Sequence, residues 1–232
     1  MKRAKLPLMK LQFISDVACP WCAIGLNSLE EALARIGSDL QAELIFEPFE
    51  LNPDMPPEGE DVVAYVARKY GSSAEELAVR QTLIRERGAE VGFTFGNRNR
   101  IWNTFDAHRL LHWAGTQGRQ RELKHALLTA YHTHGENPAS RDVLARLAGE
   151  VGLDVERARQ ILASDEFSRE VRQRVQHWQQ LGINSVPSLI VNDRYLIQGG
   201  QPPEEFEQAL RQIASESSAL SRPPDQEDST AS

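Results

Sequence analysis

The pattern of apolar and polar positions divides the first part of the chain into three elements. Residues 8–14 carry β-compatible side chains and run into the turn-like pair Ser15-Asp16, which predicts a strand. Apolar residues then recur at helical spacing over 20–36, with a proline at the first helical position, where its missing N–H costs nothing. A second apolar run at 42–46 predicts another strand. The chain therefore opens with a β-α-β unit, and its helix begins shortly after the first strand.

Seven helical segments follow this unit. Glycines, or a Gly-to-Pro stretch, separate most of them, and these residue types end helices. We expect Asn103 or Thr104 to cap the third segment and Ser140 to cap the fifth, by bonding a free backbone N–H. The predicted helices are 61–70, 74–91, 104–117, 119–134, 140–151, 155–163 and 165–181.

Strand character returns near the end of the chain. Residues 188–191 and 195–198 flank a turn signal at 192–194, which predicts a β-hairpin. A last helix is expected over 204–214, after two prolines. From residue 215 onward, serine, proline and acidic residues dominate, and so little apolar content predicts disorder.

Together these elements predict an α/β protein with the order β-α-β, a block of helices, and then β-β-α. Without the central block, the pattern meets the requirements of a thioredoxin-type sheet, namely two parallel strands, an antiparallel hairpin and a covering helix. We therefore expect a thioredoxin fold with a large inserted all-helical domain. The expected boundaries are a thioredoxin-like domain over 8–60 and 182–214, an inserted helical domain over 61–181, and a disordered tail over 215–232.

Composition narrows the range of partners. The chain has 232 residues, of which 41% are hydrophobic and 25% charged, which allows a sizeable core. Its formal net charge of −7 argues against a nucleic-acid-binding surface. No apolar run approaches the roughly 18 residues needed to cross a bilayer, and the basic first residues lead into no signal-peptide core. We therefore expect a cytoplasmic protein without a nucleic-acid or membrane partner.

Candidate chemistry concentrates at the only two cysteines, Cys19 and Cys22. Two cysteines exclude a secreted disulfide scaffold and a four-thiolate zinc site, which leaves a redox pair, a mixed Cys/His metal site or two inert thiols. His108 and His112 have the i, i+4 spacing of a metal-binding pair, but such a pair is more often two ordinary helical residues. A Pro-Trp pair between the cysteines, at a strand-to-helix junction, favours redox chemistry, and we expect no metal.

The start of the helix gives the two cysteines different roles. Cys19 lies where partial positive charge and unpaired N–H groups favour a thiolate, so we expect it to face solvent and attack a disulfide. Cys22 lies one turn further in, partly covered, and is expected to resolve the mixed disulfide. Asp16 is a candidate proton acceptor near Cys22, although a simple turn residue explains it equally well. Val186-Pro187 is either an ordinary strand start or a cis peptide whose backbone edge pairs with an extended substrate.

The segment 16–25, Asp-Val-Ala-Cys-Pro-Trp-Cys-Ala-Ile-Gly, resembles the active-site segment of the DsbA superfamily in its FrnE-like branch. The stretches 103–110, 182–188 and 199–202 are also similar to that branch. The resemblance therefore covers nearly all of the predicted folded chain.

This resemblance implies a thioredoxin fold with an inserted helical domain, with Cys19 as nucleophile and Cys22 as resolving thiol. It also implies that Pro187 is cis and that Val186 contacts the substrate. Periplasmic DsbA enzymes carry a histidine between their cysteines, and because Trp21 cannot carry its charge, we expect a milder lowering of the Cys19 pKa. The predicted substrate-binding residues are Pro20, Trp21, Asn103, His108, Val186 and Pro187.

Three functions fit these observations. The first is a thiol–disulfide oxidoreductase of the reductase or isomerase type, which acts on protein or small-molecule disulfides, binds no cofactor tightly and uses glutathione or another thiol as co-substrate. The second is a glutathione-dependent isomerase or transferase, because 2-hydroxychromene-2-carboxylate isomerases and kappa-class glutathione transferases resemble the chain outside the motif. Those enzymes generally carry serine in place of Cys19, so the presence of both cysteines favours the first function. The third is a non-catalytic holdase or interaction module.

Overall fold

The computed structural model describes residues 8–220 and is built around one four-stranded sheet. β1 (Leu8–Ser15) runs parallel to β2 (Gln41–Pro48) and antiparallel to β5 (Ser188–Val191), and β6 (Tyr195–Gln198) forms a hairpin with β5. The strand order β2-β1-β5-β6 places β1 inside the sheet. The structure confirms the predicted thioredoxin-type arrangement, and both hairpin strands have the predicted bounds.

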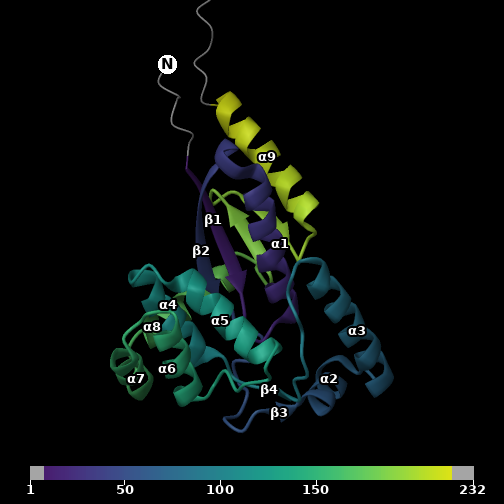
Figure 1. Cartoon of the computed structure of the whole chain (residues 1–232), viewed down its shortest axis with the longest axis vertical. Coiled ribbons are helices and arrows are strands. Elements are labelled where there is room, and N and C mark those ends of the chain that lie inside the picture. Colours follow the sequence, from purple (N-terminus) through teal and green to yellow (C-terminus); the bar gives the residue numbers. More distant parts are fainter. Residues whose placement is uncertain (1–7, 221–232) are drawn as a thin grey trace, which may run out of the picture.

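One face of this sheet is covered by two helices that lie side by side, α1 (Pro20–Ile36) and α9 (Pro203–Leu220) (Figure 1). The core between them and the sheet is made of fully buried apolar side chains that fill both layers. A short 3-10 turn, Gly37–Asp39, follows α1 and leads into β2. The core side chains include Leu11 and Phe13 of β1, Leu26 and Leu29 of α1, and Phe206 and Leu210 of α9.

The last helix is longer than the sequence predicts. Tyr195 donates a hydrogen bond to the Glu216 carboxylate over 2.9 Å, Gln212 donates another to it, and the Ser215 hydroxyl bonds back to the Gln212 carbonyl. These contacts satisfy the polar side chains within the helix, so the predicted disorder is wrong for residues 215–220. The remainder of the predicted tail, 221–232, lies outside the described residues.

The helices between β2 and β5 gather beyond the C-terminal end of β1 (Figure 1). Most of them begin or end within two residues of the predicted bounds. Two short strands, β3 (Glu60–Asp61) and β4 (Arg100–Ile101), pair with each other at the edge of this region, and a two-residue strand is too short to leave a periodic pattern. The helices are α2 (Val62–Tyr70), α3 (Ala74–Glu90), α4 (Phe105–Thr116), α5 (Gln120–His132), α6 (Arg141–Glu150), α7 (Val155–Ala163) and α8 (Ser168–Gln180).

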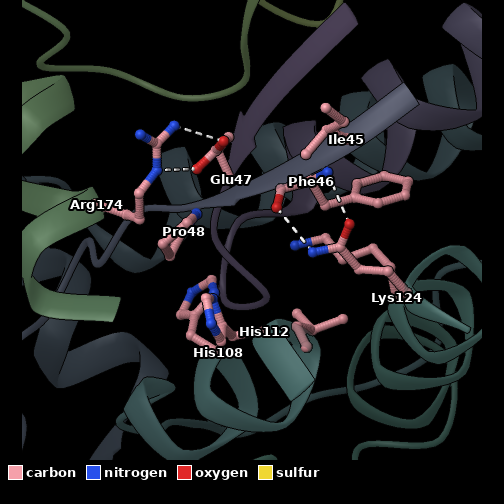
Figure 2. Close-up of a pocket in the computed structure, with 10 residues that line it drawn as sticks. Ile45, Phe46, Glu47, Pro48, His108, His112, Lys124 and Arg174 are labelled. Atoms are coloured by element: carbon pink, nitrogen blue, oxygen red, sulfur yellow. Dashed lines mark hydrogen bonds and ion pairs between the residues drawn. The ribbon is translucent and has the colours of Figure 1, made fainter. Parts of the chain in front are cut away.

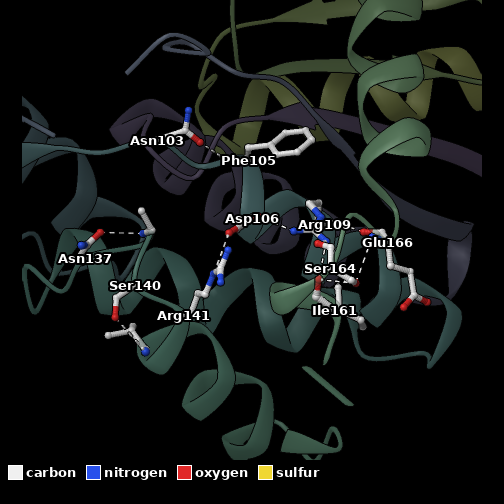
Figure 3. A network of polar contacts seen from close by, with 12 residues as sticks. Asn103, Phe105, Asp106, Arg109, Asn137, Ser140, Arg141, Ile161, Ser164 and Glu166 are labelled. Atoms are coloured by element: carbon white, nitrogen blue, oxygen red, sulfur yellow. Dashed lines mark hydrogen bonds and ion pairs between the residues drawn. The ribbon is translucent and has the colours of Figure 1, made fainter. Parts of the chain in front are cut away.

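Buried Arg109 ties α4 to the turn between α7 and α8 (Figure 3). Its guanidinium donates to the backbone carbonyls of Ile161, Ser164 and Glu166, and it forms an ion pair with Asp106 over 2.7 Å. One side chain therefore satisfies three carbonyls at the ends of neighbouring elements, as buried polar groups require.

The predicted helix caps are present in part. Ser140 accepts a hydrogen bond from the Val143 N–H and caps α6, as expected. At α4 the N-cap position is Thr104, but the capping bond to the Phe105 N–H comes from the Asn103 side chain over 2.8 Å (Figure 3). The Thr104 hydroxyl instead points to the loop that follows β1, which brings α4 close to the two cysteines.

Within the described part of the chain, no helix has both the length and the apolar character needed to cross a lipid bilayer.

Candidate functional site

The two cysteines lie at the start of α1, directly after the loop that ends β1. Cys19 is the N-cap residue, Pro20 occupies the first helical position, and the Cys22 N–H donates to the Cys19 carbonyl over 3.1 Å. Both thiols are free. The expectation that Cys19 faces solvent is wrong, since only 5% of it is exposed and Val186 lies against its sulfur; Cys22 is completely buried.

The loop before Cys19 is held from the helical region. His132 of α5 donates from Nε2 to the Val17 carbonyl over 2.9 Å, and Arg98 donates to the Ala18 carbonyl over 3.1 Å. Arg98 also bonds the hydroxyl of Tyr131 and stacks over its ring. Burial lowers the pKa of His132 well below its usual value, so the ring is neutral and serves as a fixed donor. The backbone that presents Cys19 is therefore fixed by side chains more than 75 residues away in sequence.

The surroundings of the two thiols shift their pKa values in opposite directions. A hydrogen bond from the Cys22 thiol lowers the pKa of Cys19, and the backbone N–H groups of the first helical turn act in the same direction, while burial opposes them. Burial raises the pKa of Cys22 well above its ordinary value, and the adjacent Cys19 raises it further. The arrangement favours a thiolate on Cys19 and a proton on Cys22.

The Val186–Pro187 peptide bond is cis, as the resemblance implies. Its Val186 carbonyl lies 3.5 Å from Cys19 Sγ, so the two stretches meet although 167 positions separate them. Gly25 makes this packing possible, because a Cβ there would lie 3.0 Å from the Pro187 ring. On the other side, the Gly199 N–H donates to the Pro187 carbonyl over 2.8 Å. The turn before β5 is thereby fixed against the start of α1.

A groove of about 820 Å³ opens beside Cys19. Its walls combine aromatic and aliphatic side chains with three cations, a lining that suits a ligand with both apolar and anionic parts. Among the predicted substrate-binding residues, Pro20, Trp21 and Val186 line it. Its other walls include Phe49 of the loop after β2, Tyr65, Val66, Lys69 and Tyr70 of α2, Leu77, Arg80 and Ile84 of α3, and Arg98 before β4.

The other two candidates have different contacts. Asn103 caps α4 and donates from Nδ2 to the Pro53 carbonyl over 3.1 Å, and His108 is buried with its Nε2 3.5 Å from Asp16 Oδ1. Neither lines the groove, although both lie on α4 or at its start. Pro187 sits behind Val186, against Gly25, and is not part of the groove wall either.

Asp16 is completely buried, and its carboxylate is engaged with protein donors. Oδ1 accepts from the Thr104 hydroxyl over 2.7 Å and from the Ala18 N–H over 3.1 Å, and Oδ2 accepts from the Leu51 N–H over 2.7 Å. Burial has the largest effect and raises the pKa of Asp16, but the interactions with His108, Leu51 and Thr104 outweigh it, so the pKa is lowered. The ionised carboxylate ties together the loop before Cys19, the loop after β2 and the start of α4.

A second, smaller cavity of about 180 Å³ lies between β2, α4, α5 and α8 (Figure 2). Glu47 and Arg174 form a two-bond ion pair on one side of it, at 2.6 and 2.8 Å, and Gln120 bonds both backbone groups of Phe46 on another. Buried Lys124 also lines it. None of the residues around this cavity lines the groove.

Sequence reasoning missed Arg98, Lys124 and His132. The sequence pattern does mark Lys124, because this residue lies on the apolar face of its helix between Leu123 and Leu127, where a cation is unusual. No such pattern marks Arg98 or His132, since single polar residues at a loop and a helix end are ordinary. Among the described residues, no group of His, Cys, Asp and Glu side chains could hold a metal ion.

Comparison with known proteins identifies the architecture. A family model described as a DSBA-like thioredoxin domain matches residues 10–211. A solved structure from Streptomyces coelicolor, described as a probable DsbA oxidoreductase, is 33% identical, with 93% of this chain and 92% of that chain covered and a TM-score of 0.85.

Two more distant structures share the fold. A 2-hydroxychromene-2-carboxylate isomerase superposes with a TM-score of 0.68 at 15% identity, covering 92% of this chain and all of the other. The cytosolic disulfide reductase DsbM from Pseudomonas aeruginosa, solved with GSH, superposes with a TM-score of 0.63 at 16% identity, covering 89% of this chain and 99% of the other.

Proposed function

We propose, since the chain belongs to the family of DsbA-like thioredoxin domains, that it is a thiol–disulfide oxidoreductase of the reductase or isomerase type. The Cys19 thiolate attacks one sulfur of a substrate disulfide, a mixed disulfide forms, and the other substrate sulfur leaves as a thiolate that takes up a proton. Cys22 then loses its proton and attacks Cys19 Sγ. The second substrate thiol is released. The substrate disulfide has then been reduced by two electrons, and the Cys19–Cys22 dithiol has been oxidised to a disulfide.

The observation that carries this proposal is that the pKa values of the two thiols beside the groove are shifted in opposite directions. Only the thiolate form of cysteine attacks a disulfide, and the pKa of Cys19 is lowered while that of Cys22 is raised. Cys19 lines the groove, whereas Cys22 does not. A substrate therefore meets the reactive sulfur first.

The groove supports a disulfide substrate that is a peptide or a small molecule with anionic groups. Lys69, Arg80 and Arg98 line it together with one carboxylate, Glu50, whose pKa burial raises. The Val186 backbone lies beside Cys19 and lines the groove, which suits main-chain pairing with an extended substrate. Glutathione is a peptide thiol with anionic carboxylates, which matches this lining. We propose glutathione or another thiol as the co-substrate that regenerates the dithiol.

A glutathione-dependent isomerase or transferase is the alternative, since an isomerase of that kind shares the fold. In such an enzyme the bound glutathione, not the protein dithiol, supplies the working thiolate. The two cysteines then have no chemical task, so a Cys19→Ser, Cys22→Ser double variant would keep full glutathione-dependent turnover. Under our proposal that variant has no disulfide exchange activity.

The first experiment is the reduction potential of the Cys19–Cys22 pair, measured in glutathione redox buffers with tryptophan fluorescence as the readout, because Trp21 stands between the cysteines. A value near about −270 mV indicates a reductase, and a value of about −120 to −180 mV indicates an oxidant or isomerase. A protein that shows no redox transition in any buffer would overturn the proposal.

A further inference from the structure

Lys124 of α5 is buried to 1% exposure, a rare state for a lysine. Elsewhere in the described chain, lysines such as Lys10 and Lys69 pair with carboxylate or carbonyl oxygens at the surface. The Lys124 side chain has no hydrogen bond or ion pair with any described residue, and Figure 2 shows it running from α5 toward the smaller cavity. A buried amine without a partner is costly, so its presence calls for a reason.

The neighbours of Lys124 on α5 show where it points. One turn before it, Gln120 bonds the backbone of Phe46 in β2. One turn after it, Leu128 packs in the same core as Ala23 of α1. Lys124 therefore lies on a stretch of α5 that faces β2 and the core beneath α1, and it lines the smaller cavity, not the groove. Burial has the largest effect on the pKa of this amine and lowers it, while Cys22, Asp16 and Cys19, in that order, act in the opposite direction.

Resolution of a mixed disulfide needs a base at Cys22, because that thiol is completely buried and holds its proton firmly. The Asp16 carboxylate is a poor candidate, since both of its oxygens already accept hydrogen bonds from Thr104, Ala18 and Leu51. The Lys124 amine has no hydrogen-bond or ion-pair partner among the described residues, and it interacts electrostatically with both Cys22 and Asp16.

We propose that Lys124 is the proton acceptor for Cys22. This inference rests on the proposed function. As Cys22 attacks Cys19 Sγ, its proton passes to the neutral Lys124 amine, the new Cys19–Cys22 bond forms, and the bond between Cys19 and the substrate sulfur breaks. The substrate leaves as a thiolate on the groove side, and the proton remains on Lys124 as the ammonium.

Burial lowers the pKa of Lys124, and this shift favours the neutral form of the amine, which is the form that can accept a proton. Once Cys22 loses its proton, the thiolate and the ammonium attract each other in a region of low dielectric, which favours the transfer. The cavity of about 180 Å³ beside Lys124 provides room for the ammonium to be solvated. Among the described residues, the titratable and charged groups around Lys124 are Cys19 and Cys22 at the start of α1, Asp16 of the loop before it, His108 and His112 of α4, Glu47 of β2, His132 of α5 and Arg174 of α8.

The test isolates the resolution step. Cys19 is converted to a mixed disulfide with 2-nitro-5-thiobenzoate, and release of the coloured thiol by Cys22 is followed by stopped-flow absorbance over a range of pH. Lys124→Met keeps the length of the side chain and removes the base. We expect release at neutral pH to slow at least tenfold and its pH dependence to move to higher pH, since Cys22 must then ionise unaided.

Two variants complete the design. Arg121→Met removes an exposed cation one turn earlier on the same helix, paired with Glu30, and should leave both the rate and its pH dependence unchanged. Asp16→Asn distinguishes the two candidate bases. An unchanged pH profile in Lys124→Met, or loss of release in Asp16→Asn alone, overturns the role of Lys124 while the redox function stands. Failure of Cys19 to form the mixed disulfide at all would contradict the proposed function itself.

Discussion

The two groups of helices inserted between β2 and β5 differ in how much apolar surface they bury. Helices α4 to α7 share one core, in which Leu110, Leu123 and Ile161 are fully buried. Helices α2 and α3 have only a small cluster with the adjoining loops, and Val79 and Leu83 of α3 remain 72% and 46% exposed. One inserted region therefore contains a firmly packed part and a lightly packed part.

Each part contacts a different side of the site. The α4–α7 group holds the cysteine loop in place, because His132 bonds the loop before Cys19 and Thr104 bonds Asp16. The α2–α3 pair forms the far wall of the groove through Tyr65 and Leu77. Since lightly packed elements open and adjust at low free-energy cost, we expect the α4–α7 group to keep the cysteines in place and the α2–α3 pair to adjust to a bound ligand.

The largest effect on the free energy of unfolding is expected when a buried cation is removed from the firmly packed helices. Arg109→Met leaves the carbonyls of Ile161, Ser164 and Glu166 without their donor, and we expect the free energy of unfolding to fall by about 3–5 kcal/mol. Urea denaturation measures it. The control is Arg80→Met on α3, where the cost should stay below about 1 kcal/mol. Equal losses in the two variants would contradict the difference in packing.

Truncating one leucine in each group gives the next largest effect. Leu123→Ala in α5 should lower the free energy of unfolding by about 2–5 kcal/mol, because the side chain is fully buried and leaves a cavity. Leu83→Ala in α3 removes a half-exposed side chain and should change it by no more than about 0.5 kcal/mol. Urea titration of both variants checks this, and a large loss at Leu83 would show that α3 is packed more firmly than its exposure indicates.

Acid should loosen the firmly packed helices through His132. Burial lowers the pKa of this ring in the folded state, so the unfolded state binds the proton more readily. The stabilising contribution is full above the unfolded pKa of about 6.5 and is lost as pH falls below it. Unfolding free energies measured from pH 8 to pH 5 should decline, and His132→Gln should flatten that part of the curve. An identical pH dependence in the variant would refute this role for His132.

The smallest expected effect lies on the groove wall. Tyr70 of α2 is 54% exposed and lines the groove, so Tyr70→Ala should leave the unfolding free energy nearly unchanged. The KM of the Tyr70→Ala variant for a peptide disulfide should rise about 3- to 10-fold, because the substrate loses contact with the aromatic ring, while kcat is retained. Steady-state kinetics test this, with Tyr195→Phe on β6, outside the groove, as the control. A fall in kcat with KM unchanged would place Tyr70 in the chemistry instead.

Local patterns predicted what local sequence determines. The Cys19–Cys22 spacing, the proline after Cys19 and the hairpin signal at 192–194 act over a few residues, and the structure has the expected helix start and hairpin. The exposure of Cys19 depends on Val186, which lies 167 positions away, and no local pattern contains that contact.

The same limit applies to the polar groups that hold the site. His132 bonds Val17 across 115 positions, and Arg109 bonds Ile161 across 52. Such contacts follow from how helices pack, so the residue types alone did not reveal them. Lys124 is the exception, because a cation on an apolar stripe is itself a signal.

The pairing of β1 with β5 has a consequence for synthesis of the protein. Leu11 pairs with Val191, so the central strand waits for its antiparallel partner until most of the chain has left the ribosome. The inserted helices, whose contacts are largely local, emerge complete well before that point. A nascent chain therefore displays its cysteine pair without the Val186 carbonyl or the finished groove. The wall of the groove at Val186 is therefore completed only late in synthesis, shortly before the C-terminal hairpin is made.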